Sequence, residues 1–160
     1  MIKNNITRLL EAKNFQFEAF VLPPIKLSAE ETANILNIPV SIVFKTIILK
    51  PDKPGKPIAA LIPADRIADQ KKIAQATNEK KVHFPAPAEA EKLTGLQTGG
   101  ITAIALINKG FRILLDQAAE NLEWFHISGG QRGLNIKMKV HDFVKLTNAK
   151  IMDISKPIND

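Results

Sequence analysis

The stretch VFKTIILKPDKPGKPIAALI, residues 43–62, decides the expected fold of this 160-residue chain. Its two apolar runs, 44–50 and 58–62, are rich in β-branched residues, and the segment between them contains three prolines and Gly55. Short apolar runs bounded by turn-forming residues are typical of strands, because glycine and proline favour tight turns. We therefore expect a β-hairpin at the centre of the fold.

Lys45 interrupts the most apolar run of the chain, residues 40–49. Burying a polar group without a partner costs about 2 kcal/mol or more, so the ammonium either extends to water or is held where a ligand meets it. A lysine on an edge strand also discourages pairing with strands of other molecules. The residues around Lys45 leave a functional and a purely structural interpretation open.

The rest of the chain alternates between helical and strand-like patterns without a repeating βαβ unit. Ser28 and Glu31 predict a capping box, Gly95 predicts a left-handed helix end, and residues 108–110 predict the turn of a second hairpin. Helices are expected at residues 2–13, 28–36, 69–77, 88–93 and 141–146, and strands at 15–21, 44–50, 58–62, 81–84, 101–107, 111–115, 124–127, 134–138 and 149–154. The expected fold class is α+β: a single domain over residues 1–160, with a mixed, largely antiparallel sheet and surrounding helices.

The composition limits which functions the chain can have. Cysteine is absent, which excludes disulfides and a cysteine nucleophile, and the three histidines lack metal-ligand spacing, so we expect neither metal nor cofactor. No run approaches the roughly 20 apolar residues of a membrane span, and we expect a cytoplasmic protein without a membrane partner. The net charge of +6 suits an acidic partner such as RNA, although a solvated basic surface would have the same composition.

Two glycine-containing segments are candidate binding sites, TGGIT at 98–102 and SGGQRG at 128–133. Glycine lets backbone N–H groups converge on an anion or a developing oxyanion, and Arg132 adds a group suited to phosphate or carboxylate. The spacing matches neither the dinucleotide fingerprint nor the Walker loop. A structural hairpin turn at 128–133 and a bulge at Gly99 and Gly100 are the alternatives. Beside the loop, His126 is expected to be an ordinary strand residue rather than a general base.

The segments VFKTIIL at 43–49, TGGIT at 98–102 and ISGGQRGLNIKM at 127–138 together resemble the YbaK/ProX-type aminoacyl-tRNA deacylases, which are related to the editing insertion of bacterial prolyl-tRNA synthetase. The resemblance covers most of the chain. It implies a cytosolic, free-standing enzyme that hydrolyses the ester bond of mischarged tRNA without a metal, with Cys-tRNA(Pro) or another small amino acid on tRNA(Pro) as substrate. It also implies that the enzyme binds the acceptor end of aminoacyl-tRNA and has prolyl-tRNA synthetase as a partner. In cysteine-specific relatives the substrate's own thiol is thought to attack the ester, which suits a site without an obvious protein nucleophile.

The same resemblance implies a set of site residues. Lys45 matches the family's essential lysine, which would hold a carbonyl or phosphate oxygen. The expected substrate-binding residues are Phe20, Thr46, Gly99, Gly100, Ile101, Ser128, Gly129, Gly130, Arg132 and Asn135.

Departures from the family pattern bear on substrate choice. Phe20 stands where cysteine-specific relatives have tyrosine, and Gln131 and Asn135 replace the lysine and aspartate of the SGGKRGLD version. Two other functions stay open at this point. One is a non-catalytic module that binds aminoacyl-tRNA or a synthetase, and the other is a protein-interaction domain with Lys45 exposed and remote from the glycine loop.

Overall fold

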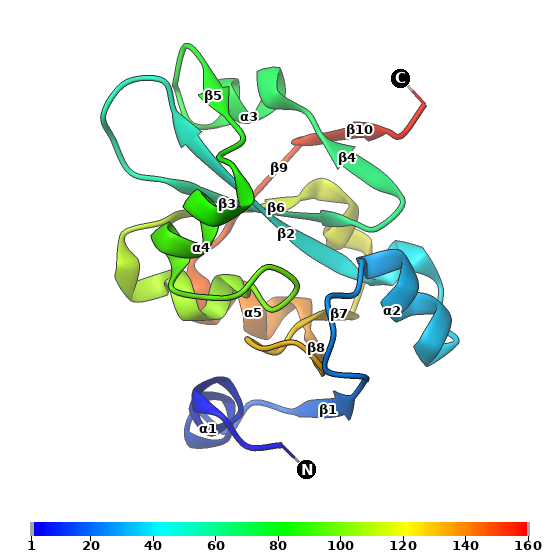
Figure 1. Ribbon diagram of the computed structural model, residues 1–160. Helices are drawn as coiled ribbons and strands as arrows, with labels where there is room; N and C mark the ends of the chain where they lie inside the picture. Colours follow the sequence, from blue (N-terminus) through cyan, green and yellow to red (C-terminus); the bar gives the residue numbers. More distant parts are fainter. Residues whose placement is uncertain (1, 160) are drawn as a thin grey trace.

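A five-stranded mixed sheet lies at the centre of the molecule (Figure 1). The computed structural model describes residues 2–159. The strands of this sheet lie in the order β5 (Val82–His83), β2 (Phe44–Pro51), β3 (Ile58–Pro63), β6 (Arg112–Asp116) and β9 (Lys150–Met152). β2 and β3 form the predicted hairpin, in which Lys45 lies opposite Ile62, whereas β6 and β9 extend the sheet in parallel.

The second sheet is three-stranded and antiparallel, and it consists of β1 (Phe17–Val21), β8 (Leu134–Lys139) and β7 (Trp124–Ser128) in that order. A bridge between Val43 and His126 joins it to the start of β2. A short pair of strands, which the sequence pattern does not predict, consists of β4 (Arg66–Ala68) and β10 (Ser155–Pro157). The predicted α+β class with mixed, largely antiparallel pairing is therefore confirmed.

The five predicted α-helices are all present, as α1 (Asn5–Ala12), α2 (Ala29–Leu36), α3 (Gln70–Ala76), α4 (Pro87–Thr94) and α5 (Val140–Thr147). Their signals act as the sequence predicts, since Ser28 and Glu31 form a capping box at α2 and Gly95 ends α4 in the left-handed conformation. Two short 3-10 helices follow Pro39 and Asp116, η1 (Val40–Ile42) and η3 (Gln117–Asn121). None of the helices within residues 2–159 has the length and apolar character that crossing a membrane requires.

The predicted strand at residues 101–107, and with it the second hairpin, is wrong. Ala103–Lys109 forms a 3-10 helix, η2, and β6 pairs in parallel with β3. The side chain of Thr102 caps this helix, and the buried side chains of Ile104 and Leu106 anchor it in the core. A continuous apolar run fits a buried helix as well as a strand, because it has no clear period of two or of 3.6 residues. Tertiary packing therefore decides its conformation.

Three aromatic rings lock the two sheets together. The ring centroid of Phe125 on β7 lies 5.3 Å from that of Phe44 on β2 and 5.3 Å from that of Phe143 on α5, both in edge-to-face geometry. All three side chains are buried in the largest core cluster. The core therefore fixes the start of β2 beside β7.

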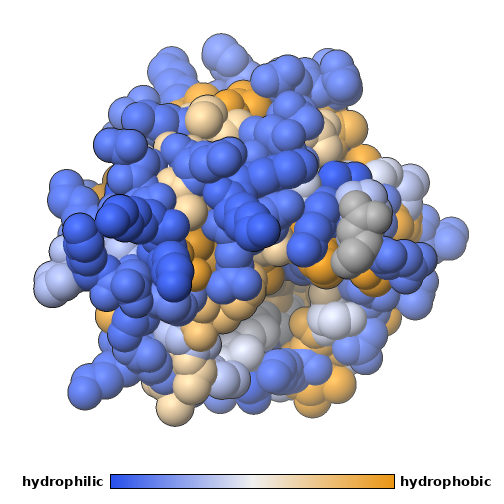
Figure 2. All heavy atoms as spheres, turned by 90° about the horizontal axis from the view of Figure 1, so that it is seen from above, coloured by the Kyte–Doolittle hydropathy of each residue, from blue (hydrophilic) through white to orange (hydrophobic). Residues whose placement is uncertain are grey.

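On the surface seen from above, hydrophilic side chains predominate and apolar ones show only in areas between them (Figure 2).

Candidate active site

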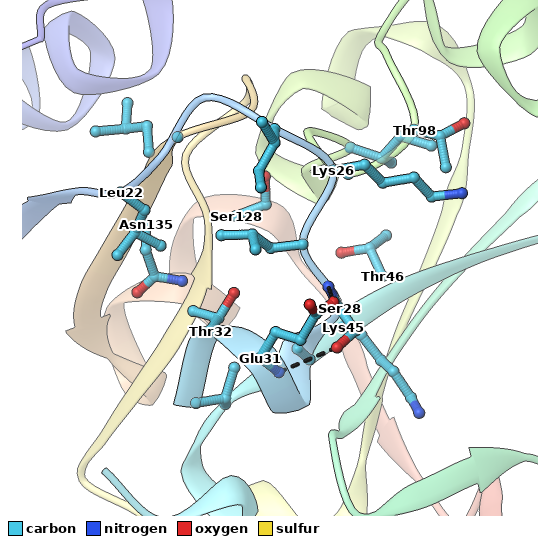
Figure 3. A pocket seen from close by; sticks show the side chains of 18 of the residues that line it. Leu22, Lys26, Ser28, Glu31, Thr32, Lys45, Thr46, Thr98, Ser128 and Asn135 are labelled. Carbon is cyan, nitrogen blue, oxygen red and sulfur yellow. Dashed lines mark hydrogen bonds between the residues drawn. The ribbon is translucent and has the colours of Figure 1, made fainter. Parts of the chain in front are cut away.

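A cavity of about 520 Å³ opens where the start of β2 meets the hairpin between β7 and β8. Side chains from four separate segments line it, within residues 22–32, 43–46, 98–101 and 128–135. Figure 3 shows Thr32, Lys45, Thr98 and Ser128 around this one space, although they are far apart in the sequence. Cavities of about 300–1,000 Å³ are typical of small-molecule sites. This cavity is therefore the candidate active site.

Lys45 reaches the cavity from an open strand edge. β2 pairs with β3 along residues 44–49, but β5 pairs with β2 only at Lys50 and Pro51. On the second edge of β2, β7 is bridged at Val43 and β5 pairs from Lys50, and no strand pairs with Lys45 between them within residues 2–159. Neighbouring side chains on a strand point to opposite faces, yet Lys45 and Thr46 both line the cavity, so the cavity wraps around this edge. We call Lys45 and Thr46 the strand wall.

The ammonium of Lys45 is partly buried and weakly held. Its Nζ donates a long hydrogen bond of 3.4 Å to the carbonyl oxygen of Ala64. Burial lowers the pKa of Lys45, and the negative charges of Glu30 and Asp65 oppose that shift. In Figure 3 the end of the side chain points away from Ser128. Lys45 therefore borders the cavity as a cation without a close ion-pair partner among the described residues.

The opposite side of the cavity, which we call the hairpin wall, consists of Ser128 and Asn135. These residues lie directly opposite each other at the last pair of the β7–β8 ladder. The hydroxyl of Ser128 accepts a hydrogen bond of 3.2 Å from the N–H of Gly130, which leaves its own proton free for another acceptor. The expected hairpin turn is thus real, and it also forms one side of a cavity.

His126 lies beside the hairpin wall, two residues before Ser128 on the same face of the sheet, and does not line the cavity. The Nδ1 atom of His126 lies 2.9 Å from the Oδ1 atom of Asn135. Its ring also contacts the ring of Phe20, with centroids 5.5 Å apart. Burial lowers the pKa of His126, although the hydrogen bond with Asn135 opposes the shift. The neutral imidazole is therefore part of the support of the wall.

The glycines predicted to approach a ligand pack mainly against the protein itself. A Cβ atom on Gly100 would lie 2.8 Å from backbone atoms of Gln131, and one on Gly129 would lie 2.5 Å from the Leu134 side chain. The N–H groups of Gly100, Gly129 and Gly130 all donate to acceptors inside the protein. Close packing, rather than an exposed backbone, therefore explains glycine at 100 and 129.

Gly99 differs because it lines the cavity and its N–H has no acceptor among residues 2–159. Arg132 fixes the neighbouring backbone by donating a hydrogen bond of 2.8 Å from Nε to the carbonyl oxygen of Thr98. Thr98 in turn donates through its N–H and its hydroxyl to Glu91, at 2.7 and 2.9 Å. These bonds, with smaller contributions from the charges of Arg132 and Lys26, lower the pKa of the half-buried Glu91. Lys26 and Arg132 thus place two cations beside Gly99.

The structure brings together part of the predicted set of site residues. Those that line the cavity are Lys45, Thr46, Gly99, Ile101, Ser128 and Asn135. Those that lie outside its lining, and act on it through packing or hydrogen bonds, are Phe20, Gly100, Gly129, Gly130 and Arg132.

Sequence reasoning missed Lys26 and Thr32, which line the cavity from the connection between β1 and α2. Their only sequence signal is proximity to the capping box of α2, which by itself indicates a helix start. Within residues 2–159, no group of three or more His, Asp or Glu side chains is placed to hold a metal ion. The chemistry available at the cavity is that of the two ammonium groups of Lys26 and Lys45, the carboxylate of Glu31, hydroxyls, a carboxamide and backbone donors.

Comparison with known proteins identifies the family. The family model of the aminoacyl-tRNA editing domain matches residues 23–146, which include both walls of the cavity. The chain belongs to the aminoacyl-tRNA editing domain family. The predicted resemblance to this group of deacylases is therefore confirmed.

Two relatives show how this editing domain occurs in other proteins. EbsC of Enterococcus faecalis, a candidate Cys-tRNA(Pro)/Cys-tRNA(Cys) deacylase, is 31% identical over 155 residues, 96% of this chain and 93% of that protein. The proline–tRNA ligase of Geobacter metallireducens is 27% identical over 136 residues, 85% of this chain but 23% of the ligase. The editing domain is thus similar to a chain of its own size and to one part of a larger synthetase.

Solved structures share the fold at lower identity. A hypothetical protein is 21% identical with a TM-score of 0.86, covering 96% of this chain and all of that chain. A candidate trans-editing enzyme for prolyl-tRNA synthetase is 19% identical with a TM-score of 0.79, covering 98% of this chain and 99% of that one. At these identities the likeness shows the fold of the editing domain alone.

Proposed function

We propose that this editing domain hydrolyses the ester bond of mischarged aminoacyl-tRNA, acting in trans in the cytoplasm. The substrate would be tRNA(Pro) that carries a small amino acid, and cysteine is the first candidate for that amino acid. The observation that carries the proposal is that Lys45 and the hairpin wall border one cavity in a chain of this family. The relationship to EbsC and to proline–tRNA ligases supports both the reaction and the tRNA.

The proposed role of Lys45 is electrostatic. Attack on an ester places negative charge on the carbonyl oxygen, and an ammonium in a partly buried site stabilises that charge more than it would in water. Lys45 meets this need because it is partly buried and has only the long hydrogen bond to Ala64 to give up. The hydroxyls of Thr46 and Ser128 and the N–H of Gly99 would supply further donors around the ester.

The attacking group in this proposal comes from water or from the substrate. Ser128 borders the cavity, but no histidine lines it to activate a hydroxyl, and the chain has no cysteine. A thiol on the amino acid, or a water molecule held by the polar lining, is then the nucleophile. A nucleophile that does not come from the protein is compatible with an enzyme that works by positioning the substrate and by stabilising charge.

Recognition of the RNA would begin at the part of the cavity lined by Gly99. Lys26 and Arg132 lie around Gly99 and can attract the phosphates next to the terminal adenosine. The net charge of +6 adds a long-range attraction. We propose that the acceptor end supplies most of the contacts and that prolyl-tRNA synthetase supplies tRNA identity as a partner.

A deacylation assay tests the proposal directly. Cysteine, alanine, serine and proline esters of tRNA(Pro), and cysteine on tRNA(Cys), are incubated with the protein, with and without prolyl-tRNA synthetase. Rapid release of one small amino acid supports the proposal. Binding of the charged tRNA without release of any amino acid would instead favour the alternative, a non-catalytic module.

A further inference from the structure

The hydrogen bond between His126 and Asn135 determines which end of the Asn135 carboxamide faces the cavity. The residue Asn135 is 5% exposed and His126 is 3% exposed, so water does not replace this contact. An amide oxygen only accepts hydrogen bonds, so the proton of the 2.9 Å bond lies on Nδ1 of the imidazole. The carbonyl end of Asn135 is therefore engaged by His126.

The other end of the carboxamide is left for the cavity. In Figure 3 the nitrogen of Asn135 points toward Thr32, a second cavity residue, while its oxygen points the other way. On the β1 side the neighbour of Asn135 is Phe20, whose side chain offers no polar atom to either end of the amide. Turning the amide over would place its NH₂ group against Nδ1 of His126, an arrangement that requires the imidazole to carry its proton on Nε2 instead.

We propose that His126 is a positioning residue that holds the Asn135 NH₂ group toward the cavity, so that the hairpin wall donates a hydrogen bond to an oxygen of the bound aminoacyl ester. This rests on the proposed function. It specifies how the hairpin wall recognises a substrate: the wall meets an acceptor, namely the ester or side-chain oxygen, and not the α-ammonium of the amino acid. A carboxylate at the same position would have the opposite preference, because it only accepts.

Three variants, compared by deacylation kinetics, distinguish a hairpin wall that donates a hydrogen bond to an oxygen from one that accepts a hydrogen bond from the α-ammonium. His126→Phe keeps an aromatic ring beside Phe20 but removes the Nδ1–H, and should lower kcat/KM about tenfold, the equivalent of one hydrogen bond. His126→Asn places an amide N–H near the former Nδ1 and should recover most of that loss. Asn135→Asp keeps the shape of the side chain but removes the donor, and should lower kcat/KM at least as much as His126→Phe. Wild-type or higher activity in Asn135→Asp would overturn the proposal, because the wall would then be meeting the α-ammonium.

The tautomer of His126 provides a readout that does not depend on activity. In ¹⁵N–¹H correlation spectra of the wild-type protein near pH 7.5, the ring of His126 should carry its proton on Nδ1, and Asn135→Leu should shift that signal. A proton on Nε2 would overturn the proposal, because Nδ1 would then accept from the Asn135 NH₂ group. If the wild type hydrolyses no aminoacyl-tRNA while His126 shows the Nδ1–H form, the proposed function fails and the orientation of Asn135 stands.

Discussion

On the strand wall, Lys45 reaches the cavity from the open edge of β2, whereas on the hairpin wall Asn135 reaches it from the middle strand of a three-stranded sheet. Lys45 is a long, charged side chain with one weak internal hydrogen bond, at 3.4 Å. Asn135 is a short, neutral side chain held by His126 at 2.9 Å. The comparison suggests a division of labour, in which one wall supplies a charge that can adjust and the other supplies fixed hydrogen-bonding groups.

The largest effect should come from removing the charge of the strand wall. Lys45→Ala should lower kcat/KM by about 10²–10³-fold, the range seen when a donor to a developing oxyanion is lost. The folded state should change little, because the side chain is partly exposed and leaves no closed cavity in the core. Deacylation kinetics measure kcat/KM, and thermal unfolding measures the stability of the folded state.

Lys50→Ala is the matched control for Lys45→Ala. Lys50 lies on the same strand but pairs with Glu89 at 2.6 Å and does not line the cavity. Its replacement should leave kcat/KM within about twofold of the wild-type value. The fold should also remain intact, since an exposed ion pair contributes only about 0–1 kcal/mol to stability. An equal loss in both variants would show that general charge, and not the position of Lys45, matters.

The second prediction tests whether the hairpin wall depends on close packing. Gly100→Ala should destabilise the fold by about 1–3 kcal/mol, because the new Cβ would lie 2.8 Å from backbone atoms of Gln131 and displace the 128–133 turn. It should also lower kcat/KM. Trp124, the single tryptophan, lies on β7 of this hairpin and can report unfolding by fluorescence.

Gly110→Ala serves as the comparison for that variant. Gly110 has a φ of 77°, yet a Cβ there would meet nothing within 4 Å. The Gly110→Ala variant should lose about 1–2 kcal/mol of unfolding free energy through backbone strain alone, and its kcat/KM should not change. If Gly100→Ala also kept full activity, the 128–133 turn would not be coupled to the site.

A smaller effect is expected at Lys26, which lines the cavity but belongs to neither wall. Lys26→Ala should weaken binding of charged tRNA a few-fold and reduce the slope of log affinity against log salt by about one. Hydrolysis of a short aminoacyl-adenosine substrate should not change if Lys26 contacts only phosphates. Lys53→Ala, in the exposed turn after β2, is the control and should leave both quantities unchanged.

The smallest predicted effect concerns pH and the support of the hairpin wall. The native pKa of His126 is lowered, first by burial and then by the charge of Lys137, while the hydrogen bond with Asn135 and the charge of Glu18 oppose the shift. The unfolded chain therefore binds the proton more readily than the native one. The stability contribution is fully present above the unfolded pKa of about 6.5 and is lost as the pH falls below that value.

Unfolding free energies between pH 7.5 and pH 5 measure this contribution. The wild type should lose more stability over that interval than His126→Phe, which has no proton to bind at this position. Parallel curves for the two proteins would mean that the native imidazole titrates as it does in the unfolded chain. Burial of a neutral His126 would then not contribute to holding the hairpin wall.

The local signals in the sequence predicted most of the elements of this fold. Proline and glycine between two apolar runs predicted the β2–β3 hairpin, and Ser28 with Glu31 predicted the start of α2, because these preferences act over a few residues. The apolar run before Gly110 was misread, because its conformation depends on the core around Ile104 and Leu106. The strands β4 and β10 were missed, because each becomes a strand only by pairing with the other.

For the site, the sequence by itself determined which residues are candidates for the chemistry: Lys45 in an apolar run, and Ser128 and Asn135 around a glycine turn. Only the tertiary structure decided how they are arranged. It placed the start of β2 against the β7–β8 hairpin, turned Gly100 and Gly129 toward the protein, and set His126 beside Asn135. The physical reason is the sequence separation over which the interactions act. Turn and cap preferences act between neighbours in the chain, whereas the cavity and the orientation of a carboxamide depend on contacts between residues far apart in the sequence.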